Sequence, residues 1–403
     1  MDSSSSSSAT MATTGAVAAL AVYMGVVQLL RFRRIRWMKR SLDARADAGE
    51  VFRQMANFEF PFMVAKSLEF ALFSTYAVPS ISRLLHKTGE FRKHVGKRYD
   101  ETDLVLREYY ENSTDTNRST TAMARMNAIH GIYAKEISNA DMLFTLSLFV
   151  TEPAVWINRR GPCLLLLFGW RRCTEFEKEV LLVYFGAMGK SMGIKGVEAW
   201  KTWEDAYTFQ TAYAEEHFRF ASSNTAIAGV TVDLFVSLLP KPFQGAARWC
   251  VYALIDPPLL KAFGFPQAPL LLQWFLKANL LLRAAVIRFL MPPRPDFLDA
   301  RRTPLSDDAE ENSADVLLKP NFCPFQDAQL GCLFYKNGYK IGELGTAVCP
   351  PGRLDEGLPS YTGSGGGGSG SVICKADGSP LELFPTPSDN GENNVGQETK
   401  KSA

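Results

Sequence analysis

The chain has 403 residues, of which 46% are hydrophobic and 12% aromatic, which excludes a chain that is disordered throughout. Its 44 Lys and Arg nearly balance 42 Asp and Glu, so we predict no nucleic-acid partner outside a local basic patch. Seven cysteines without a CxxC pair or zinc-ribbon spacing are typical of a reducing compartment.

An uncharged apolar run near the N-terminus predicts a transmembrane helix over residues 13–31. About 20 apolar residues in a helix match the thickness of the bilayer's hydrocarbon. Only Asp2 is charged before the run, whereas six basic residues follow it directly: Arg31, Arg33, Arg34, Arg36, Lys39 and Arg40. A secretory signal has its basic end first, so this order favours an uncleaved anchor. The positive-inside rule then predicts that residues 1–12 are translocated and the bulk of the chain is cytoplasmic.

The basic cluster itself is interpreted as fixing this orientation and touching lipid headgroups. The endoplasmic reticulum and the mitochondrial outer membrane would both accept such an anchor.

The sequence that follows predicts an all-α, multi-helix globular domain over residues 41–295. Residues 41–57 fit a polar amphipathic helix, and residues 60–86 fit an apolar helical pair broken near Pro79. Further helix starts are marked by Ser138, Thr174 and Thr202, each with a carboxylate in the following turn. Breaks are expected at Pro153, Gly193 and Pro240.

A second apolar stretch, residues 244–292, is interrupted by Lys, Arg and Pro. We predict core helices there, with helices lying one face down on the bilayer as the alternative, and no second span. Residues 296–350 form a C-terminal extension in which Asn337-Gly338, between two alternating runs, predicts a small β-hairpin. Residues 351–403 are rich in Gly, Ser and Pro and predict a flexible tail.

Two of the four histidines are candidate metal ligands. His130 shares the segment ARMNAIHGIYAKE with Arg125, Asn127 and Tyr133, and His217 lies in FQTAYAEEHFRF. A metal or haem iron needs a neutral imidazole on a rigid element, with its second nitrogen oriented by an acceptor. The alternative for each is a histidine satisfied by hydrogen bonds in the core or at the surface. His86 and His94 lie in a basic stretch and are interpreted as surface residues.

Several enzyme classes have no motif in the chain. It lacks HExxH zinc sites, paired ExxH motifs, a GxSxG elbow and Gly-rich nucleotide loops. Two hypotheses remain: an enzyme with a redox site for a lipophilic substrate, or a protein without catalytic activity.

The pattern of residues 55–295 resembles one oxygenase family. The matching segments are EFPF, LEFALFSTYAVPSISRLL, GKRY, RMNAIHGIYAKEISNADMLFTLSLFVTEP and AEEHF. The family joins fungal endoplasmic-reticulum-bound oxygenases of the MpaB type to bacterial rubber oxygenases, the latex-clearing proteins. The resemblance implies an all-helical fold, a b-type haem held by a histidine, and O2 as co-substrate in cleavage of an isoprenoid C=C bond.

The resemblance also departs from the family at the haem ligand. The segment expected to hold it reads Leu143-Phe144-Thr145-Leu146-Ser147 and has no histidine. Relocation to His130, to His217 or to both is the favoured interpretation, with the second histidine ligating opposite or assisting O2, and loss of the cofactor is its alternative.

The hypothesis is therefore a haem-dependent oxygenase of the endoplasmic reticulum membrane, active in secondary metabolism. In this hypothesis Arg125 pairs with a haem propionate or polarises bound oxygen, and Asn127 and Tyr133 donate hydrogen bonds. Its partners are the bilayer and a lipophilic unsaturated small molecule, with no obligate protein partner evident. The rival hypothesis is a non-catalytic helical protein that binds lipid or a partner.

Overall fold

The computed structural model describes residues 3–112, 116–159, 168–303, 317–319, 335 and 338–345. This part of the chain is predominantly α-helical and forms no sheet, which confirms the predicted helical class. The predicted tail over residues 351–403 lies outside the described residues.

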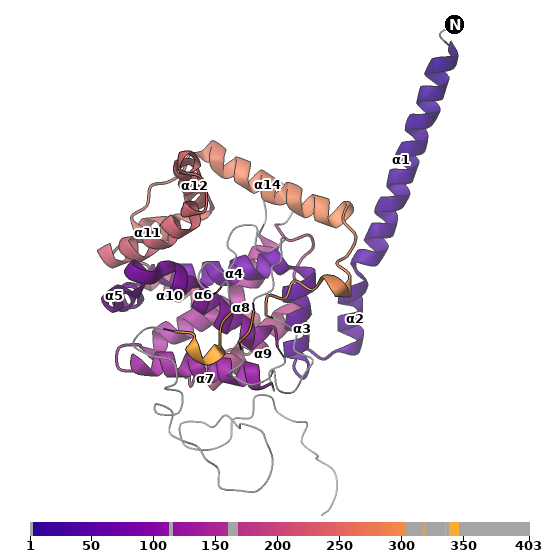
Figure 1. The fold of residues 1–403 in the computed structure, drawn as a ribbon. Coiled ribbons are helices and arrows are strands. Elements are labelled where there is room, and N and C mark those ends of the chain that lie inside the picture. Colours follow the sequence, from indigo (N-terminus) through magenta and orange to yellow (C-terminus); the bar gives the residue numbers. More distant parts are fainter. Residues whose placement is uncertain are drawn as a thin grey trace, which may run out of the picture.

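The N-terminal helix α1 (Ser3–Arg31) projects from the helical body (Figure 1). Its side chains from Met11 onward are largely exposed, and at about 1.5 Å per residue it is long enough to cross a bilayer. The short helix α2 (Arg33–Ser41) follows and packs Ile35 and Met38 into the core.

Two of the basic residues after the anchor contact protein instead of headgroups. The Arg34 guanidinium donates to the Asp296 carboxylate at 2.7 Å and to the Gln54 side chain. Arg31 is buried, stacks on the Trp170 ring at 4.6 Å and donates to the Pro292 carbonyl at 2.9 Å. The interpretation that the cluster only fixes orientation and touches headgroups is incomplete for these two arginines, because they also join the anchor to the body.

The body is built from helices that pack around one large apolar core (Figure 1). Its elements are α3 (Ala48–Gln54), the π-helix η1 (Met55–Glu59), α4 (Pro61–Thr75), α5 (Pro79–Thr88), α6 (Glu90–Tyr110), α7 (Asn117–Ile132), α8 (Asn139–Asn158), α9 (Glu175–Ser191), the 3-10 turn η2 (Val197–Ala199) and α10 (Trp203–His217). Phe52 stacks on Tyr184 at 4.8 Å and meets Phe185 edge-on at 5.1 Å, which fixes α3 against α9.

The C-terminal helices form a second layer, with their own smaller apolar cluster. They are α11 (Ser222–Ser237), α12 (Lys241–Leu254), α13 (Pro257–Phe263) and α14 (Leu270–Phe289), followed by the 3-10 turn η3 (Asp296–Leu298). In Figure 1, α14 lies along the side of the body from which α1 projects.

Capping explains where three helices begin. Ser138 accepts from the Asp141 backbone N–H at 3.0 Å, and Thr174 forms a complete capping box with Glu177. Thr202 also starts its helix, but the carboxylate that completes its capping box is that of Asp205 and not that of Glu204. The three predicted starts are confirmed.

Two element predictions were wrong. Pro153 lies inside α8, because packing on both sides of this helix outweighs the lost hydrogen bond. Residues 41–57 are not one polar helix: the Asp43 carboxylate accepts from the backbone of Arg45 and Ala46 and makes a turn, after which α3 and η1 are mostly buried. The break near Pro79 and those at Gly193 and Pro240 are confirmed.

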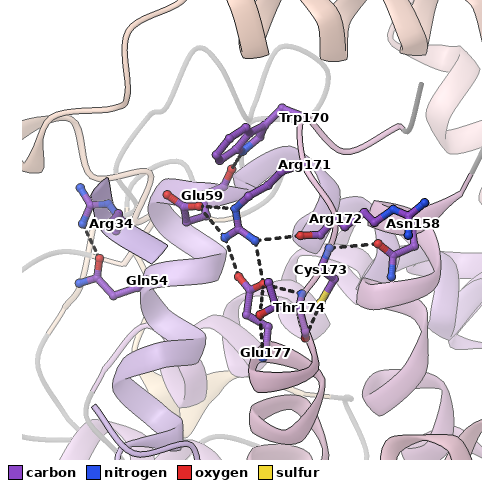
Figure 2. Close-up of polar contacts among 10 residues, drawn as sticks. All are labelled: Arg34, Gln54, Glu59, Asn158, Trp170, Arg171, Arg172, Cys173, Thr174 and Glu177. Atoms are coloured by element: carbon purple, nitrogen blue, oxygen red, sulfur yellow. Dashed lines mark hydrogen bonds and ion pairs between the residues drawn. The ribbon is translucent and has the colours of Figure 1, made fainter. Parts of the chain in front are cut away.

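A buried ion triad holds η1 to the start of α9 (Figure 2). The Arg171 guanidinium lies 2.6 Å from a carboxylate oxygen of Glu59 and 2.6 Å from one of Glu177. All three side chains are at most 5% exposed. Burial raises the pKa of Glu59, and the charge of Arg171 partly offsets the rise.

The predicted β-hairpin around Asn337-Gly338 is not supported. Tyr339 instead pairs with Leu318 in an isolated antiparallel bridge, with both N–H to O distances at 2.8 Å. The chain then forms the 3-10 turn η4 (Ile341–Glu343), which packs on α7. The Gly338 backbone N–H donates to the Tyr335 carbonyl at 3.1 Å, and Tyr339 pairs with Leu318 because Leu318, Tyr339 and Ile341 are all buried in the main core.

Candidate functional site

A cavity in the described part of the chain lies between α4, α6 and α11 and has a volume of about 70 Å³. Its wall is mainly apolar, with Leu68, Leu72 and Phe73 from α4 and Leu234 and Phe235 from α11. Drug-sized ligands occupy pockets of roughly 300–1,000 Å³, so a larger ligand requires these side chains to move.

The charged groups in the cavity wall are paired with neighbouring protein charges. The Asp103 carboxylate is 2.8 Å from Arg107 and 2.6 Å from Arg302. Burial alone would raise the pKa of Asp103, but the two guanidinium groups lower it. Glu69 is bound by Lys66 at 2.9 Å and Arg98 by Glu101 at 3.1 Å. A neutral ligand therefore suits this cavity better than a charged one.

Tyrosine hydroxyls supply neutral polar groups at the same cavity. Burial raises the pKa of Tyr76 to about 12 and that of Tyr99 well above its ordinary value. Both phenols stay protonated near neutral pH and can donate a hydrogen bond.

The predicted set on α7 contacts several different neighbours. Arg125 is fully buried and its Nε donates to the Leu344 carbonyl, while Asn127, two positions on, donates to the Ser191 carbonyl at 3.0 Å. Residues two apart on a helix point to opposite sides, so these two side chains do not converge on one ligand. Tyr133 is the half-buried C-cap of α7.

Residues just after η4 lie tightly against Arg125. Gly345 has a φ of 132°, which favours glycine, and a Cβ there would come within 3.1 Å of the Arg125 guanidinium and 2.8 Å of Ile129. The C-terminal extension thus covers the buried arginine.

His130 lies in the last turn of α7 with one ring nitrogen already oriented. Its Nδ1 is 2.8 Å from the Met126 carbonyl, which fixes Nδ1–H as donor and leaves Nε2 with a free lone pair. Burial and the charge of Arg98 lower the pKa of His130, and the Met126 carbonyl opposes them. The imidazole is therefore neutral near pH 7, as a metal ligand must be.

His217 ends α10 in a different setting. Its ring stacks on Tyr213 with centroids 3.9 Å apart, and its Nδ1 is 3.1 Å from the Tyr213 carbonyl. The Tyr213 hydroxyl donates to Asp141 at 2.9 Å, so Asp141 orients this tyrosine.

The predicted site residues are not brought together around the cavity. None of Arg125, Asn127, His130, Tyr133 and His217 lines it. Across the hydrogen bonds and ring contacts of the described ranges, none joins the two histidines. Arg98 relates the cavity to His130, because its side chain lines the cavity and its charge lowers the pKa of His130.

Sequence reasoning assigned no role to the residues that do line the cavity. Arg98 and Tyr99 belong to the GKRY segment on which the family resemblance partly rests, and this resemblance is the sequence feature that could have pointed to them. No group of three or more His, Cys, Asp or Glu in the described part of the chain could hold a metal ion.

Comparisons with known proteins find fungal relatives. A Penicillium brevicompactum protein named ER-bound oxygenase mpaB' is 29% identical over 297 residues, 68% of this chain and 68% of its own length. The ER-bound oxygenase mpaB of Penicillium roqueforti is 29% identical over 276 residues, 62% of this chain and 90% of that protein. A second Penicillium brevicompactum protein, named ER-bound oxygenase mpaB, is 34% identical over 186 residues, 43% of this chain and 45% of its own length. No family model matches the chain.

Proposed function

We propose that this chain, a homologue of the fungal ER-bound oxygenases named mpaB, is an oxidoreductase that uses O2 on a small molecule at a membrane. The observation that carries the proposal is the similarity to proteins of that name over 68% of the chain. The exposed apolar helix α1 supports the membrane location. We place the protein in the endoplasmic reticulum membrane with the helical body in the cytoplasm, following the basic residues after α1.

The substrate we propose is a lipophilic, unsaturated, isoprenoid-like molecule of secondary metabolism. The apolar cavity wall, the mutually paired charges and the neutral phenols of Tyr76 and Tyr99 support an uncharged substrate. The reaction is oxidative cleavage of a C=C bond: one O2 and one alkene give two carbonyl groups, with no external reductant. A membrane-dissolved substrate would reach an anchored enzyme by diffusion in two dimensions.

For the redox cofactor we propose haem b with His130 as the iron ligand, and His217 as the alternative. The oriented, neutral imidazole of His130 suits an iron ligand, and the guanidinium of Arg125 would pair with a propionate. Asn127 donates to the Ser191 carbonyl on the other side of α7, so we do not propose it as a donor to the same group. The cavity of about 70 Å³ does not accommodate a porphyrin with its walls in their present positions. When bound, the haem would supply the activation of O2.

The experiment is oxygen incorporation by the reconstituted full chain. The protein is incubated under ¹⁸O2 with farnesol, geranylgeraniol or squalene, and carbonyl products are analysed by mass spectrometry. We expect labelled carbonyl fragments, and their loss in Leu234→Trp, which fills the cavity. Leu238→Trp, one turn further along the chain at an exposed position, is the matched control and should keep the activity. Equal activity in both variants would remove the cavity from the reaction.

A second candidate function is a non-catalytic helical protein that binds lipid or a partner. The observation that favours it is that no imidazole lines the described cavity. In that case the purified chain binds these isoprenoids without consuming O2.

A further inference from the structure

We infer that α14 lies in the plane of the membrane surface and buries one apolar stripe in the bilayer beside the anchor α1. By length and composition α14 could cross a membrane, as could the segment Met11–Ser41 and α8. α8 is excluded as a span by its burial inside the protein, since 67% of its apolar window is buried. In α14 only 11% of the apolar window is buried, so the protein itself does not cover the exposed apolar face of this helix.

The exposed residues of α14 form a continuous apolar stripe. Leu271 is 84% exposed, and Phe275 and Leu282 are each 63% exposed. Together with Ala278 and Val286 they recur every three or four residues, which places them on one side of the helix. Trp274, also exposed, flanks the stripe, as aromatic side chains do at a membrane interface.

The opposite side of α14 is bound to the protein. Leu281 and Ala284 are buried, and the Arg283 guanidinium stacks 4.3 Å from the Phe62 ring of α4. Lys277 and Arg288 are half-buried off the stripe, so the exposed line carries no charge. A helix crossing the hydrocarbon would have to immerse these cations as well.

Both ends of α14 are held by other parts of the protein, the first by the body and the second by α1, which also argues against a second span. Before it, α13 packs Leu259, Leu260 and Phe263 into the smaller core. After it, the Leu290 carbonyl accepts from the Tyr23 hydroxyl of α1 at 2.7 Å, and the Pro292 carbonyl accepts from Arg31. Because its first end and one face are held by the body, and its second end lies against α1 near the basic residues, we infer that α14 does not cross the bilayer.

Continuity with α1 identifies the bilayer as what covers the stripe. Figure 1 shows α14 running across the direction of α1, close to the point where α1 leaves the body. Gln28 and Arg31, in the last turn of α1, donate to the Arg288 and Pro292 carbonyls, and the Tyr23 hydroxyl reaches Leu290 from about two turns earlier in the apolar run. These contacts place the end of α14 beside the C-terminal part of α1, where the run meets the basic residues. If α1 spans the membrane, α14 therefore lies at the interface, with its stripe toward the acyl chains.

The test measures the depth of three stripe positions in the full chain. Leu271→Cys, Ala278→Cys and Val286→Cys are each labelled with the fluorophore NBD and reconstituted into vesicles of phosphatidylcholine and phosphatidylserine. Glu198→Cys, at an exposed position on the body, is the control, and the unsubstituted chain gives the labelling background of the native cysteines. Nitroxides at the headgroup end or the methyl end of the acyl chain report depth.

An in-plane helix predicts blue-shifted emission at all three stripe positions relative to Glu198→Cys, with equal and preferential quenching by the shallow nitroxide. Strongest deep quenching at Ala278→Cys, with shallow quenching at the two ends, would overturn the inference in favour of a span. Emission like that of the control would place the stripe in water. A blue shift without quenching by either lipid nitroxide would assign the stripe to another copy of the chain. None of these readouts depends on oxygenase activity.

Discussion

Replacing Arg171 by Met tests the buried triad that joins η1 to α9. The substitution keeps an unbranched side chain of similar reach but removes the guanidinium that lies 2.6 Å from both Glu59 and Glu177. Two buried carboxylates are then left facing each other without a cation. Their repulsion and lost hydrogen bonds destabilise the folded state.

The magnitude follows from the burial of all three groups. Removing one partner of a buried ion pair costs about 3–5 kcal/mol of unfolding free energy, because the remaining charge is desolvated and uncompensated. For a body of this size that corresponds to a fall in Tm of about 10 °C. Arg172→Met is the matched control: its side chain is exposed, so the expected change is within about 0.5 kcal/mol.

The loss should depend on pH in a defined direction. Burial already raises the pKa of Glu59 from its ordinary 4.5, and without Arg171 it rises further. A carboxyl with a raised folded-state pKa stabilises the protein below its unfolded pKa and loses that contribution as pH rises through the folded value. The deficit of Arg171→Met should therefore be large at pH 7 and shrink below about pH 4.5.

The assay is thermal or denaturant unfolding of the detergent-solubilised full chain, followed by near-UV circular dichroism. A loss in Arg171→Met no larger than in Arg172→Met would refute the reasoning. So would a deficit that is independent of pH, since it would point to packing and not to charge.

Three further outcomes are expected. Burial, with a smaller contribution from Asp256, raises the pKa of Glu152 to about 7. The unsubstituted chain therefore loses stability as pH rises from about 4.5 to 7, and Glu152→Gln should become more stable relative to it by at most about 3 kcal/mol. Denaturant titrations that show the same difference across that pH range would contradict this. Thr174→Ala removes a capping box and should cost about 1 kcal/mol of unfolding free energy, whereas no measurable loss would mean that Glu177 holds the helix start alone. Protease added to sealed microsomes should degrade the helical body, and full protection would reverse the proposed orientation.

Much of the fold could be predicted because local signals agree with the packing. The N-caps at Ser138, Thr174 and Thr202 act through short-range hydrogen bonds that the sequence encodes directly. The predictions of a break at Pro153 and of a hairpin around Asn337-Gly338 failed because packing outweighed local preference. Pro153 lies in a helix packed on both sides, and Tyr339 pairs with Leu318, far from it in the sequence.

The site was harder to predict because its walls come from three separated helices. Leu68, Tyr99 and Leu234 meet only in the folded chain, and apolar residues carry no spacing signal for chemistry. His130 could be singled out from its polar neighbours, and the structure adds how its ring is oriented. That Arg125 and Asn127 bind different neighbours and do not converge could be seen only in the folded chain.

The visible absorption spectrum and iron content of the full chain, purified in detergent from cells supplied with haem, test the central claim most directly. We expect a haem spectrum with about one iron per chain, lost in His130→Ala and kept in His86→Ala, whose imidazole is exposed on α5. Loss in His217→Ala instead would move the ligand to α10. A colourless, iron-free protein would contradict the account.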